Sequence, residues 1–194
     1  MRKDFGAKPY CYPQPVLMIA TYDEKGIPDV MNAAWGGISE ENEISACISA
    51  GHKTTLNLLK NKAFTVSMAT VKTVAACDYV GLVSANKEPN KFEKAGFHVE
   101  KSRFVNAPLI AELPVALECR LKSYDEKTCR LVGEIVNVSV DESVLDAAGK
   151  VDPAKVQPIT FDPFNNTYLT IGGKAADAFS AGKILMKNGK EENG

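Results

Sequence analysis

The chain has 194 residues, of which 45% are hydrophobic and 24% charged, and its formal net charge is −1 at pH 7. This length fits one domain, and the composition is ordinary for a soluble globular protein. The near-zero charge argues against nucleic acid or an anionic membrane as a partner, and no apolar run approaches the roughly 20 residues that span a bilayer. The first residues lack the apolar core of a signal peptide, so we expect a cytoplasmic protein.

Short strands dominate the predicted elements, taken in chain order. Apolar periodicity predicts strands over residues 15–22, 30–36, 43–49 and 63–70, and a helix over residues 54–61 with a threonine as N-cap. Helices are also predicted over residues 73–83 and 90–95, a long hairpin over 115–124 and 129–140, and a last strand over 168–171. Residues 1–185 are predicted to form one domain, and the polar residues 186–194 a disordered tail.

The order of these elements favours a mainly β fold. Short strands with inserted helices are typical of a closed or partly closed antiparallel barrel. The strands do not alternate with helices of ten or more residues, and the glycine-rich fingerprints of nucleotide-binding folds are absent from the sequence. We therefore do not expect a parallel, doubly wound sheet.

The cysteines and histidines offer little metal chemistry. Five widely spaced cysteines include no C-x-x-C pair, and only two histidines are present, so no zinc-finger spacing can be assembled. Cys77 precedes Asp78 in a segment that can line a site, but an inert thiol is the more common state of such a residue. We expect no metal site, and the sequence leaves the reactivity of Cys77 open.

Two neighbouring segments carry the chemistry of a binding site. The segment N-A-A-W-G-G (residues 32–37) holds the only tryptophan among small residues, where backbone can approach a flat ligand closely. The segment S-A-G-H-K-T-T (residues 49–55) opens a helix and gathers hydroxyls, a lysine and free N–H groups, which suits a phosphate. Together they indicate a phosphorylated aromatic cofactor, for which flavin mononucleotide (FMN) is the best candidate. The simpler interpretations are a core tryptophan and a capped surface helix.

The order of the motifs resembles a known family. It combines N-A-A-W (residues 32–35), S-x-x-H-K-T-T-x-N (49–57), a serine followed by N-K-F (84–92) and A-P-L-I-A-E (107–112). From about Pro13 to Gly173 this pattern is similar to the flavin reductase-like, FMN-binding split-barrel proteins, and within them to the flavoredoxins. The resemblance implies a six-stranded Greek-key antiparallel barrel, one FMN per subunit, and a homodimer with the flavin near its interface.

The resemblance also implies roles for individual residues. Phosphate contacts are expected from Lys53, Thr54, Thr55 and His52, and support of the phosphate or ribityl chain from Ser49 and Ala50. Contacts to the isoalloxazine ring are expected from Asn32, Ala33, Ala34 and Trp35. Lys91 is expected near ring atoms N1 and O2, where a cation raises the flavin potential, although Lys87 and Lys94 compete for this role. Asp78 and Ser84 are expected to line the pocket, and Phe164 to close over the flavin from its own subunit or the second one.

Two positions depart from the family pattern. Where family members often carry an arginine in the phosphate segment, this chain has His52 and Lys53, so two-pronged contact of a guanidinium with the phosphate is lost. Ser84 is followed by Ala85 where many members have glycine, which leaves the geometry of that loop open.

The predicted function is electron transfer through a tightly bound FMN, reduced by NAD(P)H or by a protein donor. The chain has no Ser-His-Asp, Cys-His or paired-carboxylate pattern, so we assign no catalytic residue. Two alternatives stay open. One is an NAD(P)H:FMN reductase that releases reduced flavin to a partner oxygenase. The other is a non-catalytic barrel that binds another phosphorylated ligand or a protein.

Overall fold

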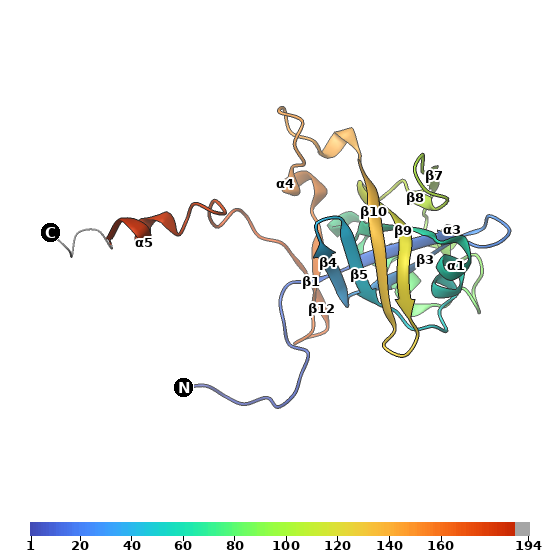
Figure 1. The fold of residues 1–194 in the computed structure, drawn as a ribbon, viewed down its shortest axis with the longest axis horizontal. Helices are drawn as coiled ribbons and strands as arrows, with labels where there is room; N and C mark the ends of the chain where they lie inside the picture. Colours follow the sequence, from blue (N-terminus) through green and yellow to red (C-terminus); the bar gives the residue numbers. More distant parts are fainter. Residues whose placement is uncertain (189–194) are drawn as a thin grey trace.

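An antiparallel sheet that curls on itself forms the centre of the fold, described for residues 1–188 in a computed structural model (Figure 1). Along this sheet the strands follow the order β3 (Pro28–Ala33), β2 (Leu17–Tyr22), β6 (Ala63–Met68), β9 (Val115–Asp125), β10 (Arg130–Val140), β5 (Glu43–Cys47) and β4 (Gly36–Glu40). The prediction of a mainly β, antiparallel fold is confirmed. The described sheet has seven strands rather than the expected six.

A two-residue link between β3 and β4 explains why the sheet curls. These strands follow each other in sequence, yet they form opposite edges of the sheet. Only Ala34 and Trp35 lie between them, and the three Cα steps from Ala33 to Gly36 reach at most about 11 Å. The two edges must therefore lie close together. The single strand predicted over residues 30–36 is wrong for the same reason, because the chain leaves one edge and enters the other within it.

The alternation of side chains on β2 divides the core into two clusters. Leu17 and Ile19 point into the cluster inside the barrel, and Met18 and Ala20 into the cluster on the outer face of the sheet. Because both faces are buried, this strand reads as a continuous apolar run in the sequence.

Three helices pack beside β3. Helix α1 (Lys53–Asn61) buries Leu58 in the inner cluster, and helices α2 (Val74–Leu82) and α3 (Lys91–Lys94) cover the outer cluster. A Cβ at Gly81 would lie 3.0 Å from the Asn32 Cβ, so the glycine allows α2 to approach β3 closely. The predicted helix over residues 54–61 is confirmed, but it begins at Lys53, and its N-cap is His52 rather than a threonine.

The remaining elements are short, and most of them were not predicted. They are β1 (Gln14–Pro15), η1 (Val71–Thr73), β7 (Val99–Lys101), β8 (Pro108–Ile110), η2 (Glu142–Val144), α4 (Pro153–Val156), β11 (Ile159–Asp162), β12 (Thr167–Thr170) and α5 (Lys183–Asn188). The predicted tail begins inside α5, and residues 189–194 lie outside the described residues. In residues 1–188, no helix has the length and apolar character needed to cross a membrane.

Substituting Gly133 tests the packing of the inner cluster. A Cβ at this position on β10 would come within 2.3 Å of the Phe64 Cζ. We expect Gly133→Ala to lower the free energy of unfolding by about 2–3 kcal/mol, as overpacked cores do, measured by urea denaturation. Gly37→Ala is the control, because a Cβ there meets no atom within 4 Å. Equal losses in the two variants would contradict the proposed clash.

Candidate functional site

Two adjoining cavities form one groove along β3. The helix-side cavity, about 260 Å³, lies between β3, the start of α1 and the end of α2. The tryptophan-side cavity, about 360 Å³, lies at the other end of β3 beside Trp35. Both are lined by Met31, Asn32, His52, Gly81 and Leu82. From Asp29 in the first cavity to Ala33 in the second, β3 rises roughly 13 Å, so one elongated ligand can occupy both.

The start of α1 makes one end of the groove electropositive. The N-cap His52 forms no side-chain hydrogen bond with the helix, and the first turn holds no acidic residue. The N–H groups of that turn therefore add to the charge of Lys53, which lines the helix-side cavity with His52 and Thr54. This arrangement suits an anion such as phosphate.

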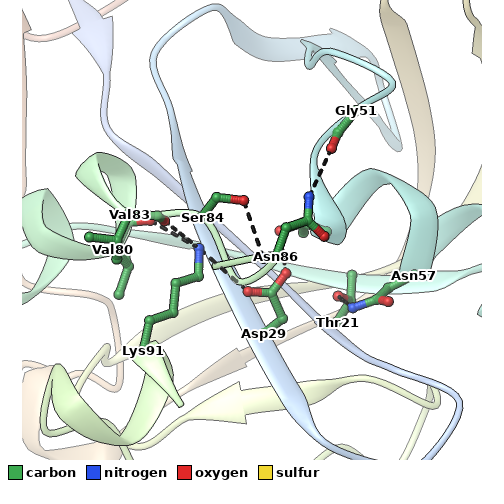
Figure 2. Close-up of polar contacts among 10 residues, drawn as sticks. Thr21, Asp29, Gly51, Asn57, Val80, Val83, Ser84, Asn86 and Lys91 are labelled. Carbon is green, nitrogen blue, oxygen red and sulfur yellow. Dashed lines mark hydrogen bonds and ion pairs between the residues drawn. The ribbon is translucent and has the colours of Figure 1, made fainter. Parts of the chain in front are cut away.

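A buried ion pair lies in the wall of the helix-side cavity (Figure 2). Lys91 Nζ is 3.4 Å from Asp29 Oδ1, and the two side chains are 4% and 5% exposed. Nζ also donates hydrogen bonds to the carbonyl oxygens of Val80 (3.1 Å) and Val83 (3.2 Å). Burial lowers the pKa of Lys91, and the charge of Asp29 opposes this shift. The ammonium thus joins α3 to β3 and to the end of α2, and it lies in the helix-side cavity rather than beside Trp35.

Thr54 and Thr55 use their hydroxyl protons within the protein. Thr54 Oγ1 donates to Asp29 Oδ2 at 2.6 Å, and Thr55 Oγ1 donates to the Ser49 carbonyl oxygen at 2.9 Å. Thr54 lines the helix-side cavity, whereas Thr55, Ser49 and Ala50 line neither cavity. Toward a ligand, the hydroxyl of Thr54 can therefore accept a hydrogen bond but not donate one.

The loop after α2 closes the helix-side cavity from the opposite side. Ser84 and Ala85 line the cavity. Asn86 Nδ2 donates to the carbonyl oxygen of Gly51 at 3.2 Å (Figure 2). The Lys87 N–H donates to the carbonyl oxygen of Ser84 at 2.9 Å. The loop after α2 therefore forms a turn that is hydrogen-bonded to the loop before α1, with alanine rather than glycine at position 85.

The tryptophan-side cavity combines small residues, an exposed aromatic ring and a partly buried hydrogen bond. Ala33, Ala34 and Trp35 line it, and Trp35 is 55% exposed, so this tryptophan is not a core residue. Tyr168 Oη donates to Asp78 Oδ1 at 2.7 Å, and both residues line the cavity. Burial and this hydrogen bond raise the pKa of Tyr168 to about 12, so its hydroxyl stays protonated at neutral pH.

Two further residues singled out in the sequence lie outside the groove. Phe164, in the turn between β11 and β12, stacks on Tyr12 with ring centroids 5.0 Å apart and packs against Tyr10 at 4.2 Å. It lines neither cavity, and its role as a cover stays a prediction. Cys77 is buried in α2, and burial raises its pKa to about 11, which favours the inert thiol. Within residues 1–188, no group of three or more His, Cys, Asp or Glu side chains is placed to hold a metal ion.

Sequence reasoning missed Asp29 and Tyr168 as groove residues. Asp29 lies two positions before Met31, on the strand face that otherwise points into the core. An acidic residue at a core-facing position of a strand indicates a buried ion pair or hydrogen bond. The sequence does not show which residues are its partners. Tyr168 meets Asp78 across 90 residues, a separation that no local pattern encodes.

Comparisons with known proteins agree with this geometry. A family model described as "Flavin reductase like domain" matches residues 10–160. The structure is similar to the flavoredoxin of Desulfovibrio vulgaris (Miyazaki F), with a TM-score of 0.89 and 36% identity, covering 94% of this chain and 100% of that one. It is also similar to a flavoredoxin from Methanosarcina acetivorans, with a TM-score of 0.83 and 28% identity, covering 96% of this chain and 98% of that one. An FMN-binding domain of a flavin reductases-like enzyme from Shewanella baltica OS155 has the same fold. Its TM-score is 0.75 at 18% identity, covering 84% of this chain and 89% of that one. The predicted family and split-barrel fold are confirmed.

Removing the Lys91 charge tests the buried ion pair. We expect Lys91→Met to lower the free energy of unfolding by about 3–5 kcal/mol, because it leaves Asp29 buried without its counter-charge. Adding Asp29→Leu should recover most of this loss, since replacing both charges removes the burial cost. Lys94→Met, at an exposed pair with Glu88, should leave the free energy of unfolding almost unchanged, because solvent screens exposed ion pairs. A Lys91→Met variant as stable as Lys94→Met in chemical denaturation would show that the pair contributes nothing.

Proposed function

The chain belongs to the flavin reductase like family, and from this we propose that it is a flavoprotein that carries electrons through a tightly bound FMN. The family match and the flavoredoxin neighbours support a flavin as the ligand. The phosphorylated form is proposed because the helix-side cavity offers an anion site.

The continuity of the groove is the observation that carries this proposal. One end presents the first turn of α1 and Lys53, which attract a phosphate. The other end presents small residues and Trp35, which admit and flank a flat ring. FMN has these two parts at the two ends of one molecule, joined by its ribityl chain. When bound, FMN supplies the redox chemistry, and the protein supplies position and electrostatics.

We extend the proposal to the partners. NAD(P)H or a reduced protein would deliver electrons to the flavin, and the protein would act in the cytoplasm as a homodimer. The exposed apolar side chains of Trp35 and Ile38 support a subunit contact near the groove, being 55% and 63% exposed.

A visible spectrum of the purified protein tests the function directly. We expect the absorption bands of oxidised flavin, because the anion site favours retention of FMN. Anaerobic addition of NADH or NADPH then separates two kinds of protein. Bleaching by either nucleotide indicates a pyridine nucleotide-dependent reductase, and bleaching by dithionite alone indicates a carrier with a protein donor. A colourless preparation that cannot be reconstituted with FMN would refute the proposal and favour the non-catalytic barrel.

Lys53→Ala tests the anion site. We expect it to weaken FMN binding about tenfold, the loss typical of one charge-assisted hydrogen bond, with little effect on riboflavin, which lacks the phosphate. Dissociation constants from quenching of flavin fluorescence provide the measurement. Lys60→Ala is the matched control, because Lys60 lies in the last turn of α1 and pairs with Glu24 instead. An equal rise in the dissociation constants of FMN and riboflavin would show that Lys53 does not contact the phosphate.

A further inference from the structure

Asp29 combines three properties that the anion site alone does not explain. Asp29 is 4% exposed, and it lines the helix-side cavity. Its Oδ1 is a buried oxygen that accepts no hydrogen bond from the described residues. The nearest cation, Lys91 Nζ, pairs with this oxygen at the long distance of 3.4 Å, and two of its three N–H groups are directed at backbone carbonyl oxygens. A buried carboxylate oxygen without a donor is costly, so the groove retains unused capacity to accept a hydrogen bond.

Thr54 extends this acceptor character. Its hydroxyl proton is directed at Asp29 Oδ2, so only its lone pairs remain for a ligand in the cavity that it lines. Asp29 and Thr54 therefore form an acceptor pair, which can recognise hydroxyl or amine donors but not a phosphate or a carbonyl group. The pair lies next to the hydrogen-bond donors at the start of α1. The same cavity wall therefore presents donors and acceptors side by side.

The position of this acceptor pair in the groove indicates which part of the ligand it would contact. Asp29 lies at the start of β3, and the residues shared by both cavities, Met31 and Asn32, lead from it toward Trp35. Because Thr54 belongs to the first turn of α1 and bonds Asp29, a flavin with its phosphate at α1 and its ring beside Trp35 would bring the ribityl hydroxyls nearest the phosphate to this pair. We propose that Asp29, with Thr54, is a specificity-determining residue that accepts hydrogen bonds from the polyol chain of the ligand. This inference rests on the proposed function.

Lys91 makes a carboxylate tolerable at this position. An uncompensated acid beside the anion site would repel a phosphate at short range. The buried ammonium offsets that charge, so the carboxylate keeps its strength as a charged acceptor without making the cavity negative. The simpler role of Asp29, holding Lys91 in place, predicts no dependence on the hydroxyls of the ligand, and this difference makes the two roles separable.

The test compares FMN with an analogue whose ribityl chain is replaced by an unsubstituted phosphopentyl chain. Dissociation constants for both ligands are measured by quenching of flavin fluorescence. Wild-type protein is expected to prefer FMN by about tenfold or more, as for a hydrogen bond to a charged group. Asp29→Asn and Thr54→Val should reduce this preference to about threefold or less, because each removes acceptor strength while preserving size.

Two further variants control for structural effects. Thr54→Ser keeps the hydroxyl and should keep the preference for FMN. Thr21→Val removes a buried hydroxyl on β2 that pairs with Asn57 and lies directly across from Asp29 in the sheet, but lines neither cavity, so it too should keep the preference. If Asp29→Asn does not fold, Thr54→Val carries the same test.

The outcomes separate this inference from the proposed function. An unchanged preference in Asp29→Asn and Thr54→Val, with both ligands weakened equally, would assign the pair a purely structural role and overturn the inference alone. A wild-type protein that binds FMN and the analogue equally well would do the same. A wild-type protein that binds neither flavin would overturn the proposed function, and this inference with it.

Discussion

The buried contact between Asp29 and Lys91 determines how the elements around the groove are arranged. Through these two side chains β3 is joined to α3 and to the carbonyl oxygens at the end of α2, and Thr54 adds the first turn of α1. Such a pair is stable only when both charges are present and well surrounded. Elements distant in sequence therefore meet at one point, and the loop bearing Ser84 is placed over the cavity by the same contact.

The groove that results has a polarity that changes along its length. Backbone N–H groups and Lys53 provide donors at the start of α1, while the oxygens of Asp29 and Thr54 provide acceptors next to them. Small residues and an exposed Trp35 follow at the far end. A ligand with an anionic end, a hydroxylated middle and a flat end matches this order. Flavin chemistry then needs little more from the protein than a defined position and a defined electrostatic environment.

The sequence predicted those parts of the molecule that depend on local patterns. The hairpin of β9 and β10 and the helix α1 follow from periodicity within a dozen residues, and the segments at residues 32–35 and 52–54 reach the groove as motif spacing indicated. The direction of the Thr54 hydroxyl could not be predicted, because its acceptor is 25 residues away on another strand. Lys91 was assigned to the ligand from its motif, but its neighbours emerge only when α2 and α3 pack together. Phe164 packs on two tyrosines of the N-terminal segment, a contact with no local signature.

The short connection through Ala34 and Trp35 gives the barrel a mechanical property. Since these two residues bridge the opposite edges of the sheet and also line the cavity, any widening of the seam between the edges is transmitted directly to the walls around Trp35. A rigid planar ligand held there would act as a spacer that sets the width of the seam. Separation of the two edges and loss of a ligand from this cavity would therefore both depend on the same two residues.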